Sequence, residues 1–204
     1  MSAKKMFLSF LPWIAFSVLA NRHGNNGATT ACLVSVGLAL LLAIKQSKNS
    51  SLKIIDVTGI VIFGAMTVVA AIGGAAVENR VIDFGLGGAS ILLGVVMLAS
   101  TLFVPFTEQY ARESVPREYW KSPVFRAVNR RISAVWGVAV LVMGVGPLIA
   151  GHFDPASAPK AGARPLDLIF NWVVPVLLIL WAMNYTKKAS AAAGSDAPAV
   201  SVAQ

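Results

Sequence analysis

Asn171 and Pro175 place a polar side chain and a proline four residues apart inside the last apolar stretch of the chain. Proline has no amide hydrogen, so the carbonyl of Asn171 would lose its usual helical partner. In hydrocarbon, a freed carbonyl beside a side-chain amide is available to hydrogen-bond a ligand. We therefore predict a ligand or pathway site at Asn171 and Pro175; the alternative is that Asn171 bonds only to a neighbouring helix.

Asp56 is a third candidate for this pathway, because it opens another apolar stretch beside Lys53. An acidic side chain within a membrane span marks a functional site by default. The alternative is an interfacial acid that only complements the dipole at the start of its helix.

Residues 107–131 form the one long charged segment of the sequence. Glu108 and Arg112 stand four residues apart with the acid first, a spacing that predicts a helical ion pair. Ser122 followed by Pro123 is typical of an N-cap and a first helical residue, so a helix is predicted to begin at Pro123. We predict that this segment is a cytoplasmic platform for anionic lipid headgroups or a protein partner. The alternative is an ion-paired connector that only sets the orientation of the chain.

The platform combines charged, amide and aromatic side chains. Within its predicted helix the polar residues lie opposite an apolar face, and arginines so near a helix N-terminus oppose the dipole and need a negative partner. That partner is either a glutamate of the same segment or a lipid phosphate. The platform residues are Glu108, Arg112, Trp120, Arg126, Asn129, Arg130 and Arg131, of which Arg126, Asn129 and Arg130 share the polar face.

Several chemistries lack the residues that they need. The two histidines, His23 and His152, lie between apolar stretches, and Cys32 is the only cysteine. A histidine-rich metal or haem site within the membrane is therefore excluded. The sequence also has no phosphate loop, carboxylate cluster or nucleophile–base pair. We predict no metal, no cofactor and no enzymatic activity.

Composition indicates which solvent these residues meet. The 204 residues are 56% hydrophobic and 13% charged, whereas a soluble domain is roughly 25% charged. A helix crosses the bilayer core with about 20 mostly apolar residues. Six stretches reach or approach this length, at 6–20, 27–44, 54–77, 84–106, 132–151 and 166–183. We predict an all-α integral membrane protein with six transmembrane helices over residues 1–188 and a disordered tail over 189–204.

The distribution of cations predicts the orientation. The formal net charge is +8, but the 17 Lys and Arg residues fall in the gaps between apolar stretches, which argues against nucleic acid as a partner. Thirteen of the 17 lie on the side that holds both termini and residues 107–131. Because cationic loops stay in the cytoplasm, both termini are predicted to be cytoplasmic, in a multi-pass protein of the bacterial inner membrane.

Glycine is concentrated in the third and fourth apolar stretches. Gly87 and Gly88 are predicted to let these two helices pack closely as an antiparallel hairpin, with residues 78–83 as the turn. The alternative is that the glycines line a thin-walled pathway or a lipid groove.

Part of the charged segment resembles a known pattern. The residues Pro105 to Arg112 (PFTEQYAR) are followed by Val115-Pro116, Tyr119-Trp120, Ser122-Pro123 and Asn129-Arg130. Together they resemble a signature of small bacterial polytopic inner-membrane proteins of uncharacterised function. The opening tetrapeptide that ends at Trp13 (FLPW), with the series of short helices, is similar to the intracellular septation protein A group. That likeness implies a role in cell division or envelope maintenance, and neither resemblance implies a catalytic residue.

Two functions are compatible with these features. The Asn171 locus and the glycine-rich hairpin favour transport or permeation of an unidentified solute or lipid. The dense cytoplasmic segment and the lack of deep charges favour a non-catalytic scaffold or accessory subunit. Such a scaffold would recruit a membrane-protein partner, a second copy of the chain or anionic lipid through residues 107–131.

Overall fold

The computed structural model describes residues 6, 8–20, 27–47, 52–153 and 168–195. These residues are helical almost throughout, and no strand occurs among them. Four of the helices are long and apolar enough to cross a membrane. The predicted class, an all-α membrane protein, is therefore confirmed at this level.

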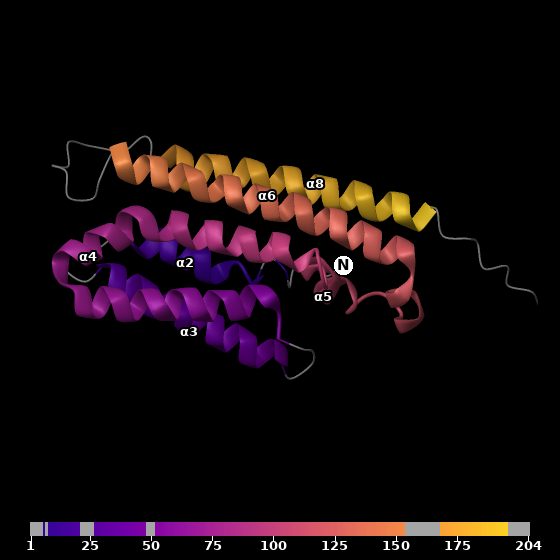
Figure 1. The fold of residues 1–204 in the computed structure, drawn as a ribbon, viewed down its shortest axis with the longest axis horizontal. Helices are drawn as coiled ribbons and strands as arrows, with labels where there is room; N and C mark the ends of the chain where they lie inside the picture. The colour runs from indigo at the N-terminus through magenta and orange to yellow at the C-terminus, as the bar shows by residue number, and fades with distance from the viewer. Residues whose placement is uncertain (1–5, 7, 21–26, 48–51, 154–167, 196–204) are drawn as a thin grey trace, which may run out of the picture.

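Most of the helices run lengthwise along a single bundle (Figure 1). The elements are α2 (Leu11–Ala20), α3 (Gly27–Ser47), α4 (Ile54–Ser100), α5 (Phe106–Ala111), the 3₁₀ helix η1 (Arg117–Lys121), α6 (Pro123–Phe153), the π-helix η2 (Ile169–Val173) and α8 (Val174–Ser195). Helix α8 packs along α6 at one edge of the bundle. Helix α8 continues to Ser195 and so includes residues 189–195 of the predicted tail, and residues 196–204 lie outside the described ranges.

Gly74 divides α4 into two antiparallel halves. A straight helix of 47 residues would be about 70 Å long, more than twice the hydrocarbon thickness. At Gly74 the backbone has φ 69° and ψ −174°, a conformation that glycine adopts without steric cost. Figure 1 shows the two halves side by side. The hairpin between the third and fourth stretches was predicted, but its turn is at Gly74, and residues 78–83 are helical.

The second half of α4 packs on α6 through small residues. A Cβ atom added at Gly87 would lie 2.7 Å from the backbone oxygen of Gly144, and one added at Gly144 would lie 2.8 Å from the oxygen of Gly87. The two backbones are thus in direct contact, the arrangement that small residues permit between membrane helices. Gly88 differs, because a Cβ atom there would meet nothing within 4 Å. The close contact is therefore made with α6, whereas the sequence predicted it between the two halves of the hairpin. It involves Gly87 but not Gly88.

This asymmetry makes the two neighbours a matched pair for mutation. We expect Gly87→Leu to force α4 away from α6 and to lower the free energy of unfolding by about 1–3 kcal/mol. Gly88→Leu should leave stability unchanged or raise it slightly, because leucine is the better helix former. Thermal unfolding of both variants in the same detergent measures the difference. Equal losses of stability would contradict the contact with Gly144.

Helix α2 packs against α3 and α4. Its Phe16 is fully buried against Phe63 of α4, with 5.6 Å between the ring centroids. Trp13 packs edge-on against the same Phe63 at 5.1 Å. The far edge of the Trp13 six-membered ring lies at Gly59, where an added Cβ atom would come within 2.9 Å of it. Trp13 is thus fixed by α4 on one side.

Glu78 ties the start of α3 to α4. Its carboxylate accepts hydrogen bonds from the backbone nitrogens of Ala28, at 2.8 Å, and Thr29, at 3.2 Å, and from the Thr29 hydroxyl. The first amides of a helix have no partner within the helix, and the dipole there favours a negative charge. Glu78 is therefore a helix cap supplied from 50 residues along the chain, a role that its position in a predicted turn did not suggest.

Candidate functional site

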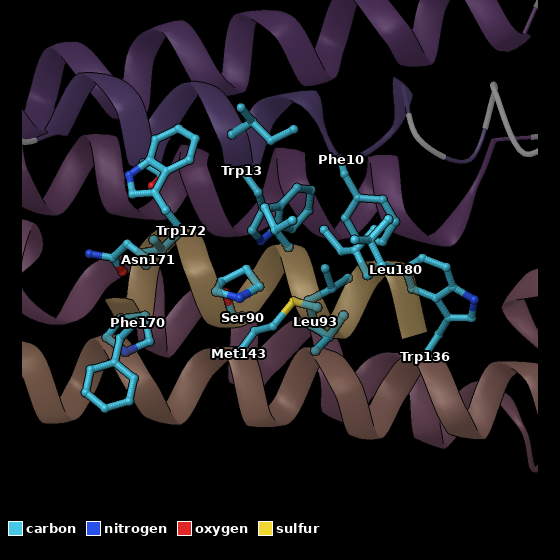
Figure 2. Close-up of a pocket in the computed structure, with 18 of the residues that line it drawn as sticks. Phe10, Trp13, Ser90, Leu93, Trp136, Met143, Phe170, Asn171, Trp172 and Leu180 are labelled. Carbon is cyan, nitrogen blue, oxygen red and sulfur yellow. The ribbon is translucent and has the colours of Figure 1, made fainter. Parts of the chain in front are cut away.

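A cavity of about 580 Å³ lies between α8 and the pair formed by α2 and the second half of α4, with α6 as its floor (Figure 2). Its size falls within the range of small-molecule sites. The lining residues are Met6, Phe10, Trp13, Ile14, Ser17, Leu86, Ser90, Leu93, Trp136, Val140, Met143, Pro147, Phe170, Asn171, Trp172, Pro175, Val176, Ile179, Leu180 and Met183.

The described residues that line this pocket carry no charge. None of these 20 residues is Asp, Glu, His, Lys or Arg, and most are aliphatic or aromatic. A hydrated ion or a strongly polar solute would lose its water there without compensation. An apolar or lipid-like molecule would not carry this desolvation cost. The chemistry of the pocket is therefore that of the bilayer interior, with a few polar atoms added.

The predicted locus at Asn171 and Pro175 is part of this pocket. Asn171 belongs to η2, a single turn of π-helix in which the nitrogen of Val174 bonds to the oxygen of Ile169. Pro175 follows this turn directly and lines the same wall. Turns of this kind are often found at functional sites. The cavity therefore reaches Asn171. The residues around Asn171 in the pocket lining are mostly apolar, whereas the sequence predicted a site that depends on polar groups.

Asp56 lies elsewhere, in a buried polar network between the start of α4, the end of α3 and α5. It is almost fully buried, and its Oδ2 accepts a hydrogen bond of 2.9 Å from Nε2 of Gln46. The same Gln46 nitrogen lies 3.4 Å from the Ser9 hydroxyl, which also accepts a hydrogen bond from Tyr110. Burial raises the pKa of the Tyr110 phenol, which keeps it protonated as a donor. The structure therefore separates Asp56 from the other two pathway candidates.

Lys53 connects this network to α5. Its Nζ lies 2.7 Å from Glu113 and donates to the backbone oxygen of Gln109 at 2.8 Å, and the side chain is only 1% exposed. The Gln109 side chain accepts from the nitrogen of Ile54, the first residue of α4. From the sequence, Lys53 is predicted to be one of the thirteen cytoplasmic cations. In the structure it is a buried partner that holds α5 against the start of α4, a pairing across 60 residues.

The charged segment contains the local structure that its spacing predicts. Arg112 forms an ion pair with Glu108 one helical turn away, with its Nε 3.0 Å from Oε1. The Ser122 hydroxyl accepts a hydrogen bond of 3.1 Å from the nitrogen of Phe125, so it caps α6, which begins at Pro123. Both predictions are confirmed.

The exposed platform is smaller than the predicted one. Glu108 is 2% exposed, and Asn129 is buried, with its backbone oxygen accepting from the Thr107 hydroxyl at 2.9 Å. Asn129 therefore faces α5, not the polar surface. The Trp120 ring contacts two arginines: its centroid lies 5.0 Å from the guanidinium carbon of Arg112 and 5.6 Å from that of Arg117. The exposed cations of residues 107–131 are Arg117, Lys121, Arg126, Arg130 and Arg131.

The fold and the pocket define a class: a helical protein with membrane-length helices around a cavity whose described lining is uncharged. Comparison with family models, curated proteins and solved structures finds no match for this chain. The site must therefore be interpreted from its own residues.

Proposed function

We propose that this chain is a small multi-pass protein of the bacterial inner membrane that transports or passes a lipid-like molecule. The observation that carries the proposal is the pocket of about 580 Å³ between α2, α4, α6 and α8, whose described lining residues carry no charge. The apolar lining of this pocket favours ligands that are themselves mostly apolar, which is a smaller class than the solutes and lipids considered from the sequence. No catalytic step is part of the proposal.

The proposed topology has six spans with both termini in the cytoplasm. The break at Gly74 supports counting α4 as two spans, and α2, α3, α6 and α8 supply the others. Helix α2 has only ten residues, about 15 Å, so its span must include the residues that precede it. The excess of cations on one side supports the orientation.

Ser90 offers a direct test of transport. It lies on α4 at the pocket wall, so phenylalanine there would occupy the cavity, whereas Ala99 of the same helix is exposed and outside the pocket. In vesicles that contain the purified protein, we expect a fluorescent uncharged lipid to become accessible to an external quencher faster than in empty vesicles. Ser90→Phe should remove most of this acceleration, and the control Ala99→Phe should retain it. Wild-type vesicles that behave like empty ones would overturn the transport proposal.

A second candidate is the scaffold role, with its link to division or envelope maintenance. It is favoured by the five exposed cations of η1 and α6, which lie together at one end of the bundle. Such a group attracts an anionic membrane surface or an acidic partner. Under this alternative, binding to partners or anionic vesicles would be unaffected by Ser90→Phe, and no lipid movement would be seen.

A further inference from the structure

Two polar atoms of α2 are buried at the pocket and have no hydrogen-bond partner among the described residues. Trp13 is 7% exposed, and no acceptor in the described part of the chain lies within hydrogen-bond distance of its Nε1. The Ser17 hydroxyl is likewise buried and without a hydrogen bond to the described residues. A buried donor left without a partner costs about 1–3 kcal/mol. Such groups are expected where a ligand supplies the missing partner.

Both atoms belong to one face of α2. Residues four apart lie one turn above each other, so Trp13 and Ser17 are neighbours on the pocket wall. The six-membered ring of Trp13 is held at Gly59, on the far side from the pocket. Figure 2 shows the indole nitrogen of Trp13 on the pocket side of the ring. Trp136 differs, because its Nε1 already donates to Thr186 at 3.0 Å.

These atoms and their surroundings define the head of the ligand. An indole nitrogen can only donate, so the ligand must offer an acceptor atom, such as a carbonyl oxygen. No cation lines the pocket among the described residues, so a phosphate or carboxylate head would be buried there without a counter-charge from them. Four other aromatic residues line the pocket: Phe170 and Trp172 at one end, and Phe10 and Trp136, stacked on each other at 5.9 Å, at the other (Figure 2). Aromatic side chains favour a flat ring, which packs against them edge-on or offset.

We propose that the pocket binds an uncharged lipid whose head is a flat ring with carbonyl oxygens, the chemistry of a prenyl quinone. A ring oxygen accepts from Trp13 Nε1 and from the Ser17 hydroxyl, and the apolar chain extends along α8. This assignment rests on the proposed function only in naming the pocket as the ligand site. It does not require that the ligand be moved across the membrane.

Equilibrium binding to the purified full chain in detergent tests the assignment. The probes are a short-chain prenyl quinone, a long-chain alcohol, diacylglycerol and phosphatidylglycerol. We expect one quinone per chain, weaker binding of the alcohol and diacylglycerol, and no competition by phosphatidylglycerol. Trp13→Phe, which retains an aromatic ring and removes the donor, and Ser17→Ala should each weaken quinone binding about 3–10-fold. Ser90→Phe should abolish it, and Ala99→Phe should not change it.

Each contrary result has a distinct meaning. Equal binding of quinone and alcohol, or unchanged binding by both α2 variants, would overturn the ring-carbonyl assignment. Competition by phosphatidylglycerol would overturn the uncharged head. A dimer that Ser90→Phe converts to a monomer would show that a second copy fills the pocket, which also overturns the assignment. Quinone binding without lipid movement in vesicles would overturn transport alone, and lipid movement without quinone binding would overturn the ligand alone.

Discussion

Replacing Glu78 with alanine is expected to destabilise the whole bundle more than any surface substitution. The change removes the carboxylate that accepts from the backbone nitrogens of Ala28 and Thr29 at the start of α3. Hydrogen bonds to a charged group contribute about 1.5–3 kcal/mol each, and the Ala28 amide left behind is buried. We expect the free energy of unfolding to fall by about 2–4 kcal/mol, which lowers the unfolding midpoint by roughly 5–15 °C.

Two milder variants control for this result. Glu78→Gln keeps one acceptor oxygen but loses the charge that the helix dipole favours, so its midpoint should lie between those of wild type and Glu78→Ala. Thr29→Val removes only the hydroxyl contact, so it should cost about 1 kcal/mol. The readout is thermal unfolding in detergent. A Glu78→Ala protein that unfolds at the wild-type temperature would contradict the cap.

Local features of the fold could be predicted from the sequence. The Glu108–Arg112 pair and the Ser122 cap each depend on residues three or four positions apart, where helix geometry alone fixes the contact. Apolar length likewise predicted the membrane class. The turn of α4 was placed at the most polar residues between two stretches, whereas the chain turns at Gly74, where the required φ is positive.

Pairings across the chain could not be predicted in this way. Glu78 meets Ala28 across 50 residues, and Lys53 meets Glu113 across 60, so no local spacing connects them. Both were interpreted as loop charges because burial is invisible in a single sequence. The position of Asn171 was informative, since a proline marks a helix that cannot satisfy its own backbone. What lines the opposite wall, Trp13 above all, depends on how four helices pack.

Identification of the lipid that co-purifies with the chain tests the central claim most directly. Among the described residues the pocket lining has no charge, and Trp13 and Ser17 have no hydrogen-bond partner, so we expect purification in mild detergent to retain an uncharged lipid, about one per chain. Mass spectrometry of the extracted lipids would identify it and measure its enrichment over the membrane from which the protein was taken. Ser90→Phe should lose this lipid, and Ala99→Phe should keep it. A bound fraction that has the composition of the bulk membrane and is identical in both variants would contradict a lipid-binding pocket.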